Sequence, residues 1–138
     1  FFGYTHCPDV CPQTLAVMSQ VIPQLPEVAR ENLQMLFVSV DQQRDTPQEL
    51  AAYLSYFNAD ITGLTGETLE LRKLTAPLGI AYTTEPLNDT NEYLVQHSSA
   101  VLVIDPQLRL VGIFSPPHRA TDMAARFRKM RAFVEEQT

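Results

Sequence analysis

The side chains with the most distinctive chemistry in this sequence are Cys7 and Cys11, its only two cysteines. They lie four positions apart, between a run of aromatic residues and an apolar segment with helical spacing. That order predicts a strand, a tight turn and a helix. Backbone N–H groups and the positive end of a helix stabilise a thiolate, so a cysteine pair at this junction favours redox or metal chemistry.

The Cys-x-x-x-Cys spacing leaves both kinds of chemistry open. It is one residue longer than the Cys-x-x-Cys pair of thioredoxin-type oxidoreductases, in which the second thiol resolves a mixed disulfide quickly. The wider spacing suits a metal ion held between two thiolates at about 2.3 Å each, and it still permits a disulfide. The flanking prolines and the position at a turn argue against two inert buried cysteines.

Pro12 predicts where the regular helix begins. Proline costs about 3 kcal/mol or more inside a helix but almost nothing at the first helical position, so we expect a helix from Pro12 to about Ile22 with Cys11 as its cap. The alternative is a helix that starts at Pro8 and bends at Pro12. Both alternatives place the two sulfurs on one surface.

The rest of the chain supplies the elements that would position this pair. A nearly continuous apolar run predicts a central strand covered on both faces, and a capping box with proline at the first helical position predicts the helix after it. Two later apolar runs predict an antiparallel hairpin. The expected elements are a strand at 34–40, helices at 46–57 and 67–75, a loop at 58–66, a short strand at 79–84, a polar surface excursion at 85–92, strands at 100–104 and 108–114, and a final helix from Thr121, capped by Thr121 or Ala120.

This order of elements predicts an α/β fold of the thioredoxin-like type. A parallel βαβ half and an antiparallel half would share one mixed sheet, flanked by helices on both faces. A chain of 138 residues with 45% hydrophobic content fits one domain spanning residues 1–138. Because the sequence opens within a predicted strand, we expect N-terminal strands, and any signal or membrane anchor, to lie upstream of it.

The composition narrows the class of partner. A formal net charge of −6 at pH 7 argues against nucleic acid or an anionic membrane as a partner, since both need clustered lysine and arginine. No apolar run approaches the roughly 18 residues that a membrane-spanning helix requires. Separately, we expect the domain to be monomeric and to contact a membrane only through an upstream anchor.

A histidine far along the chain is the candidate for completing the cysteine site. His97 precedes the strand predicted at 100–104, and in a thioredoxin-like sheet that loop faces the redox turn. Two thiolates and an imidazole suit Cu(I), and can also hold Cu(II) or Zn(II). The alternative for His97 is a cap of the strand entry through hydrogen bonds. His6 should point away from Cys7 by strand alternation, and His118 is expected on the surface.

Two charged residues lie beside the predicted site. Arg44 and Asp45 either form an ion pair that fixes the loop next to the cysteines or cap the helix that begins at Thr46. The aromatic residues are expected in the core, namely Phe37, Tyr53, Phe57 and Phe114.

Several motifs, in order along the chain, carry a resemblance to a known family. They are Thr5–Pro12, Val38–Asp41 with Arg44–Pro47, Gly63–Gly66, Tyr93–Ser99 and Ile104–Pro106. Together they resemble the Sco (SenC/PrrC) copper proteins of cytochrome oxidase assembly, over nearly the whole chain. One departure is Gln42, where the family often has proline, and we expect it to affect only the loop.

The resemblance implies a thioredoxin-like copper metallochaperone tethered by an N-terminal transmembrane helix. It implies one copper ion, as Cu(I) or Cu(II), bound by two cysteines and a distant histidine that match Cys7, Cys11 and His97. The family supports maturation of the binuclear copper site of cytochrome c oxidase, by passing on copper or by reducing the target cysteines. The implied partners are the copper-site subunit or another copper chaperone. The implied location is the bacterial inner membrane facing the periplasm, or the mitochondrial inner membrane facing the intermembrane space.

Two other functions compete with the copper carrier. A thiol-disulfide oxidoreductase acting on protein cysteines would use Cys7 and Cys11 as a redox pair and would not need His97. A peroxiredoxin-like peroxidase is the weaker alternative, because the Pro-x-x-x-Thr/Ser turn that precedes the reactive cysteine in such enzymes is missing around Cys7.

Overall fold

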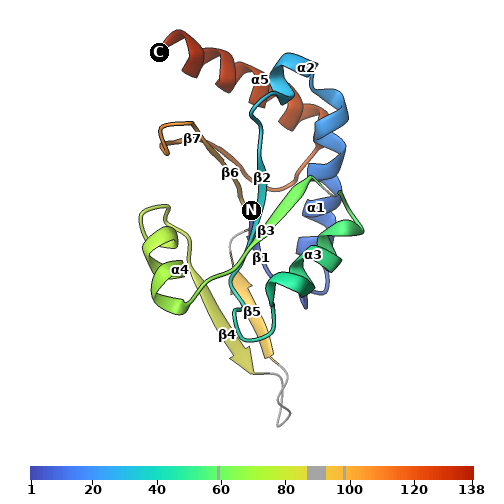
Figure 1. The fold of residues 1–138 in the computed structure, drawn as a ribbon, viewed down its shortest axis with the longest axis vertical. Coiled ribbons are helices and arrows are strands. Elements are labelled where there is room, and N and C mark those ends of the chain that lie inside the picture. Colours follow the sequence, from blue (N-terminus) through green and yellow to red (C-terminus); the bar gives the residue numbers. More distant parts are fainter. Residues whose placement is uncertain (59, 87–92, 98) are drawn as a thin grey trace.

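The computed structural model describes residues 1–58, 60–86, 93–97 and 99–138, and within 83–86 and 93–97 it describes the course of the backbone. Helices and strands alternate through the first half of the chain, and two antiparallel hairpins and a long helix make up the second half (Figure 1). The prediction of an α/β chain is confirmed.

Three parallel strands form the part of the fold that supports the cysteines. β2 (Met35–Ser39) lies between β1 (Phe2–Gly3) and β3 (Ile61–Leu64), with Phe2 opposite Val38 and Met35 opposite Ile61. β2 matches the predicted central strand, and the Phe37 side chain is completely buried in it. β3 occupies a stretch predicted as loop, which is a correction to the sequence-based expectation.

A glycine in β3 allows the neighbouring helix to approach the strand closely. A Cβ atom at Gly63 would lie 2.9 Å from Leu50 Cβ and 3.0 Å from Leu54 Cδ1, so the bare backbone lets the neighbouring helix pack directly on the strand. Glycine inside a strand is a weak strand signal on its own and marks such close approaches.

The helix after the cysteine loop begins earlier than predicted. α1 spans Val10–Val21, with Asp9 as its N-cap, and continues into a 3₁₀ turn at Ile22–Gln24 and the short helix α2 (Glu27–Arg30). Neither the start at Pro12 nor a start at Pro8 is observed. Pro12 falls in the first turn, where backbone N–H groups have no intrahelical partner, so the helix can start two residues before it.

The helix after β2 follows its capping signals. α3 (Pro47–Ser55) begins with a capping box in which Thr46 Oγ1 accepts the Glu49 N–H at 3.2 Å and Glu49 Oε2 accepts the Thr46 N–H at 3.5 Å. It ends two residues before the expected Phe57. α4 (Thr68–Thr75) follows on the other side of the parallel strands and lies within the range predicted for it.

A hairpin that the sequence pattern did not predict precedes the final elements. β4 (Tyr82–Pro86) pairs antiparallel with β5 (Tyr93–His97), with Tyr82 opposite His97. The short strand predicted at 79–84 is shifted toward the C-terminus, and His97 ends a strand instead of lying in a loop. Most of the predicted surface excursion, residues 87–92, lies outside the described residues.

The last hairpin and the last helix match their predictions closely. β6 (Val101–Ile104) and β7 (Leu110–Phe114) pair antiparallel, and α5 spans Ala120–Glu136. The Asp105 carboxylate stabilises the turn between β6 and β7, because it accepts hydrogen bonds from the N–H groups of Gln107 and Arg109 and from the Arg109 Nε–H at 2.7–2.9 Å. These hydrogen bonds lower the pKa of Asp105, and the bond from the Arg109 backbone N–H has the largest effect.

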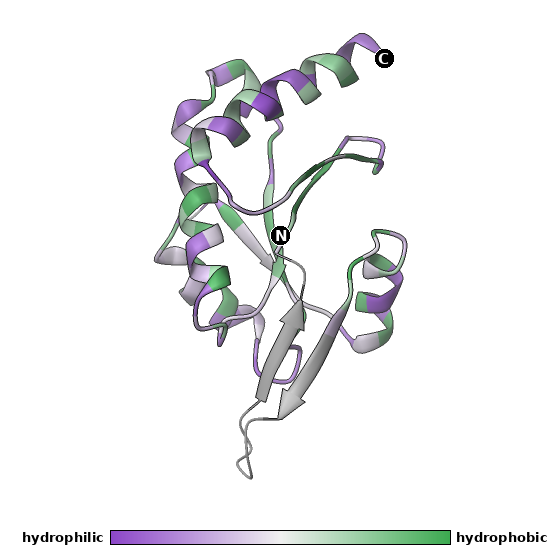
Figure 2. Cartoon of the chain, turned by 180° about the vertical axis from the view of Figure 1, so that it is seen from behind, coloured by the Kyte–Doolittle hydropathy of each residue, from purple (hydrophilic) through white to green (hydrophobic). Residues whose placement is uncertain are grey.

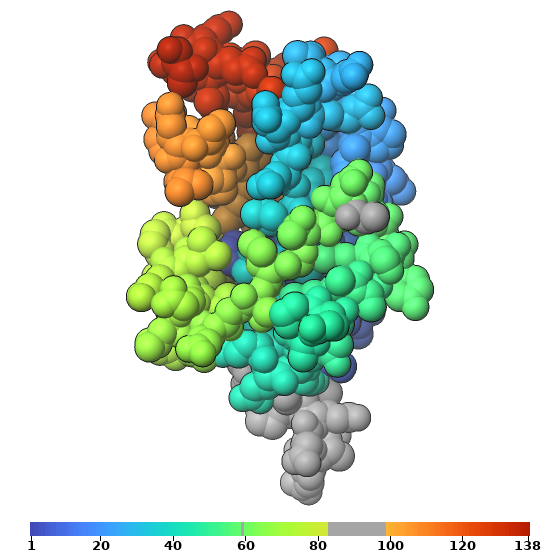
Figure 3. Space-filling model, in the orientation of Figure 1, coloured from blue at the N-terminus to red at the C-terminus, as the bar shows by residue number. Residues whose placement is uncertain are grey.

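The elements pack around a core that β2 crosses. α1 and α3 lie on one side of the parallel strands, whereas α4 lies on the other side in Figure 1. Hydrophobic residues dominate β2 and the β6–β7 hairpin in Figure 2, and this hairpin packs beneath α5 in Figure 3. Ladder hydrogen bonds among the described residues group the strands as β1–β2–β3, β4–β5 and β6–β7, where the sequence predicted one sheet. No helix in the described ranges is long and apolar enough to span a membrane.

Candidate metal centre

The loop between β1 and α1 brings the two cysteines together, as the spacing predicted. The Cys7 N–H closes a turn onto the Tyr4 carbonyl at 3.3 Å, and the Cys11 N–H then donates to Cys7 Sγ at 3.4 Å. Cys11 lies in the first turn of α1, so the amide that meets the Cys7 sulfur belongs to the positive end of that helix. Cys11 is completely buried and Cys7 is 9% exposed, so the pair sits just below the surface.

A glycine in β1 makes room for the deeper sulfur. A Cβ atom at Gly3 would lie 2.7 Å from Cys11 Sγ and 2.7 Å from Phe37 Cε2. Because both of those side chains are fully buried, neither can move aside easily. Gly3 is therefore part of the site, and the sequence offered only its position four residues before Cys7 as a clue.

Burial sets the protonation state of the deeper thiol. Desolvation raises the pKa of Cys11 well above its ordinary value, a backbone hydrogen bond from Tyr4 opposes the rise, and the nearby Cys7 sulfur adds to it. Cys11 is thus a neutral thiol at physiological pH in the metal-free protein. A metal that bound this sulfur would have to displace its proton.

A buried carboxylate anchors the cysteine loop to the end of β2. Asp45 Oδ2 accepts the Thr5 N–H at 2.9 Å and the Ser39 hydroxyl at 2.7 Å, while Asp45 Oδ1 accepts the Thr5 hydroxyl at 2.5 Å. The side chain of Asp45 has no exposed surface. Thr5 lies two residues before Cys7, so Asp45 fixes the segment from which the first sulfur projects.

This arrangement corrects the prediction for Arg44 and Asp45. Arg44 Nε pairs with Asp41 at 2.6 Å, not with Asp45, and the Arg44 guanidinium lies 5.9 Å from the centre of the Tyr4 ring. The helix after them is capped by Thr46 and Glu49. Asp45 contributes to the site by hydrogen bonds to another segment of the chain, which sequence spacing alone does not reveal.

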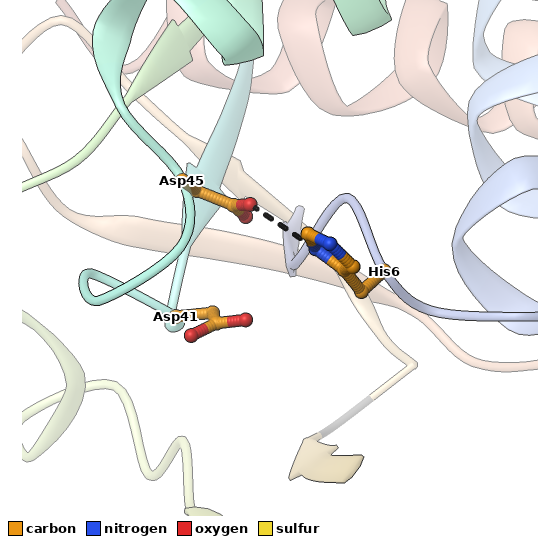
Figure 4. A group of neighbouring side chains, drawn as sticks. All are labelled: His6, Asp41 and Asp45. Atoms are coloured by element: carbon orange, nitrogen blue, oxygen red, sulfur yellow. Dashed lines mark ion pairs between the residues drawn. The ribbon is translucent and has the colours of Figure 1, made fainter. Parts of the chain in front are cut away.

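A second cluster of ligand-type side chains lies beside the cysteine loop. Atoms of His6, Asp41 and Asp45 come within 4.8 Å of one another, and Figure 4 shows the His6 ring directed toward Asp45. His6 Nδ1 is 3.9 Å from Asp45 Oδ1, and the His6 side chain is about half exposed. The two carboxylates accept hydrogen bonds from Thr5, Ser39 and Arg44, so they hold the cysteine loop against the end of β2.

For His97, the predicted third ligand, the structure describes only the backbone. His97 ends β5, and its side chain lies outside the described part of the structure, so its role as a ligand stays a prediction. His118 contacts the segment after His97, because its Nε2 lies 2.7 Å from the Ser99 carbonyl oxygen. His118 is half-buried, so its expected surface location is wrong.

Three buried polar side-chain atoms have no hydrogen-bond partner among the described residues. They are Tyr53 Oη, Tyr82 Oη and His118 Nδ1. Tyr82 pairs with His97 across the β4–β5 hairpin, and Tyr53 packs on Phe37 with ring centres 6.1 Å apart. The prediction that Tyr53 is simply a core residue missed this unpaired hydroxyl.

The fold and the cysteine pair define a class: a thioredoxin-like domain with a buried Cys-x-x-x-Cys site at the start of its first helix. A family model described as SCO1/SenC matches residues 1–132, and the chain belongs to this family. It shares 42% of 118 residues with a Stutzerimonas stutzeri protein whose name refers to copper binding; the match covers 85% of this chain and 57% of that one.

Two solved structures support the same fold. The copper-bound ScoI of Arabidopsis thaliana superposes with a TM-score of 0.83 at 29% identity, covering 95% of this chain and 81% of that one. The apo Sco1 of Thermus thermophilus superposes with a TM-score of 0.81 at 34% identity, covering 96% and 76%. The chain spans about half the length of the curated relatives it matches, including 42% of the human mitochondrial SCO1 homologue.

Proposed function

We propose that this chain is a copper-carrying domain that binds one copper ion through Cys7, Cys11 and His97. The observation that carries the proposal is the buried cysteine pair at the start of α1, in which the Cys11 N–H meets the Cys7 sulfur at 3.4 Å. Two soft sulfurs held on one surface are the donor set that Cu(I) prefers. Copper-bound structures of similar proteins from Arabidopsis thaliana and Bradyrhizobium japonicum support the choice of metal.

The site is suited to passing its ion on. Few ligands, close to the surface, allow the thiolates of a partner to replace them one at a time without release of free metal. A copper ion would bind as the two thiols lose their protons to solvent. Oxidation of Cys7 and Cys11 to a disulfide would abolish binding, so metal loading and redox state are coupled.

The cellular role that follows is support for assembly of the binuclear copper site of cytochrome c oxidase. The partner would be the subunit that carries this site, or another copper chaperone. An anchor outside the described chain would hold the domain at the bacterial inner membrane facing the periplasm, or at the mitochondrial inner membrane facing the intermembrane space, as the mitochondrial relatives suggest.

Copper titration of the reduced domain tests the proposal. Wild-type protein should bind one equivalent of Cu(I), and Cys7→Ser, Cys11→Ser and His97→Ala should each weaken binding sharply. His6→Ala is the matched control, because His6 is an exposed histidine beside Cys7 and should leave the affinity unchanged. Affinity that survives His97→Ala but falls with His6→Ala would overturn the ligand assignment.

A second function has its own support in the same loop. The Cys11 amide meets the Cys7 sulfur, and Cys7, the more exposed of the two cysteines, would be the attacking group of a thiol-disulfide oxidoreductase. In that reaction the dithiol is oxidised to a disulfide as the two target cysteines are reduced. Metal-free reduction of a target disulfide that needs Cys7 and Cys11 but tolerates His97→Ala would favour this function.

A further inference from the structure

We propose that His118 is a positioning residue for the copper site: its ring holds the short segment that follows His97, and so keeps this ligand in place before the metal binds. The inference rests on the proposed function, because it concerns the ligand role of His97. His118 lies in the loop between β7 and α5, 19 positions after Ser99, the residue that it contacts. It does not itself bind the ion.

A hydrogen bond joins His118 to this segment. His118 Nε2 lies 2.7 Å from the Ser99 carbonyl oxygen, and because a carbonyl oxygen can only accept, Nε2 carries the proton and donates. Nδ1 of the same ring is buried and has no hydrogen-bond partner among the residues that the structure describes. Within this part of the chain, the bond to Ser99 is therefore the polar contact that orients the ring.

The backbone on both sides of His118 is itself held by the core. Phe114 ends β7 and is buried, and Met123 is buried in the first turn of α5. Pro116 and Pro117 lie between them, and their rings restrict φ and so limit the conformations of the loop. His118 therefore offers its N–H from a position that the core fixes.

Ser99 lies in the middle of the link between His97 and the core. His97 ends β5, where it pairs with Tyr82. Val101 begins β6, where it is buried and pairs with Phe114. Among the described residues no ladder hydrogen bonds join β4–β5 to β6–β7, so the conformation of this link affects where His97 lies. Two residues span at most about 7 Å, so a bond at Ser99 restrains His97 closely.

Copper affinity gains from a ligand that is restrained before the ion arrives. A mobile ligand loses conformational freedom when it binds, and this loss subtracts from the binding free energy. The bond to Ser99 removes part of that loss for His97. The two cysteines are held separately, by the loop between β1 and α1, so His118 should affect binding through the histidine and not through the sulfurs.

Variants that differ in the position of one donor test this role. His118→Leu removes the donor and keeps an apolar side chain, whereas His118→Gln keeps an N–H at the end of a side chain of similar reach. We expect His118→Leu to weaken Cu(I) binding about five- to tenfold, the factor that corresponds to the net contribution of one hydrogen bond, and His118→Gln to restore most of the affinity. His118→Asn carries the same amide on a shorter side chain and should lose affinity as His118→Leu does.

A spectroscopic measurement reports on the ligand itself. The nitrogen splitting in the electron paramagnetic resonance spectrum of the Cu(II)-loaded protein should broaden in His118→Leu, because the imidazole is no longer held in one position. The splitting should recover in His118→Gln. A general loss of fold stability would not produce this pattern.

A double-mutant cycle shows whether the effect depends on His97. In the His97→Ala background, His118→Leu should cause no further loss of Cu(I) affinity, because the ligand that it positions is gone. Arg119→Ala is the control, because Arg119 is exposed, lies next to His118 and makes no side-chain cap to α5. It should leave the Cu(I) affinity unchanged.

The outcomes separate the two proposals. Equal losses of affinity with and without His97, or an affinity that is unchanged in His118→Leu and His118→Asn, would overturn this inference alone. An affinity that stays low in His118→Gln would also overturn it, because the donor would then not be the feature that matters. A Cu(I) affinity that is unchanged in His97→Ala would instead refute the ligand set of the proposed function.

Discussion

Replacement of Asp45 by alanine should separate the cysteine loop from the strand that supports it. The carboxylate accepts three hydrogen bonds, two from Thr5 and one from Ser39, at 2.5–2.9 Å. A hydrogen bond to a charged group contributes about 1.5–3 kcal/mol, but Thr5 is only half-buried and water can replace part of what it loses. We therefore expect Asp45→Ala to lower the free energy of unfolding by about 3–5 kcal/mol, a large part of the stability of a typical domain.

Equilibrium unfolding in urea, with reduced metal-free protein, measures this change directly. Ser39→Ala removes one of the three donors and should cost about 1–2 kcal/mol. Asp122→Ala is the control, because Asp122 is an exposed carboxylate on α5 whose only described ion pair, with Arg126 at 3.5 Å, is a surface contact. A loss below about 1 kcal/mol for Asp45→Ala would refute the view that this carboxylate anchors the loop.

Three further predictions concern other parts of the fold. Gly3→Ala would place a methyl group 2.7 Å from Cys11 Sγ, so it should destabilise the protein by about 1–3 kcal/mol and slow disulfide formation; normal stability and thiol reactivity would contradict this. Asp105→Asn should lower the melting temperature at neutral pH. Because the pKa of Asp105 is lowered in the folded protein, its stabilising effect is complete above the ordinary value of 3.8 and is lost as the pH falls below it, so the two melting curves should converge in acid; a constant difference would contradict this. His118→Ala removes the bond to the Ser99 carbonyl and should speed amide hydrogen exchange after residue 99 and weaken copper binding several-fold; unchanged exchange would contradict this role.

Local signals predicted the elements that hold the cysteine pair. The capping box at Thr46 and Glu49 is observed as expected, and the apolar run of β2 forms the buried central strand. The convergence of Cys7 and Cys11 follows from their spacing at a helix start. Such features depend on interactions within a few residues, which is why the sequence reveals them.

Features that depend on distant residues were missed. β3 was predicted as a loop because it contains Gly63. Glycine is needed there because α3 packs closely on the strand, which the local sequence does not show. The hydrogen bonds from Thr5 to Asp45 join residues 40 positions apart, and no local pattern in either segment predicts them. The unpaired Tyr53 hydroxyl likewise appears only when the core is assembled. The aromatic and β-branched residues before His97 are typical of a strand, so β5 has a local signal in the sequence.

X-ray absorption of the Cu(I)-loaded, reduced domain at the copper edge is the most direct measurement of the central claim. We expect a first shell of two sulfurs and one imidazole nitrogen around copper in the wild type. The nitrogen should be absent in His97→Ala and present in His6→Ala, with both sulfurs retained. A nitrogen shell that persists in His97→Ala, or fewer than two sulfurs in the wild type, would contradict the account.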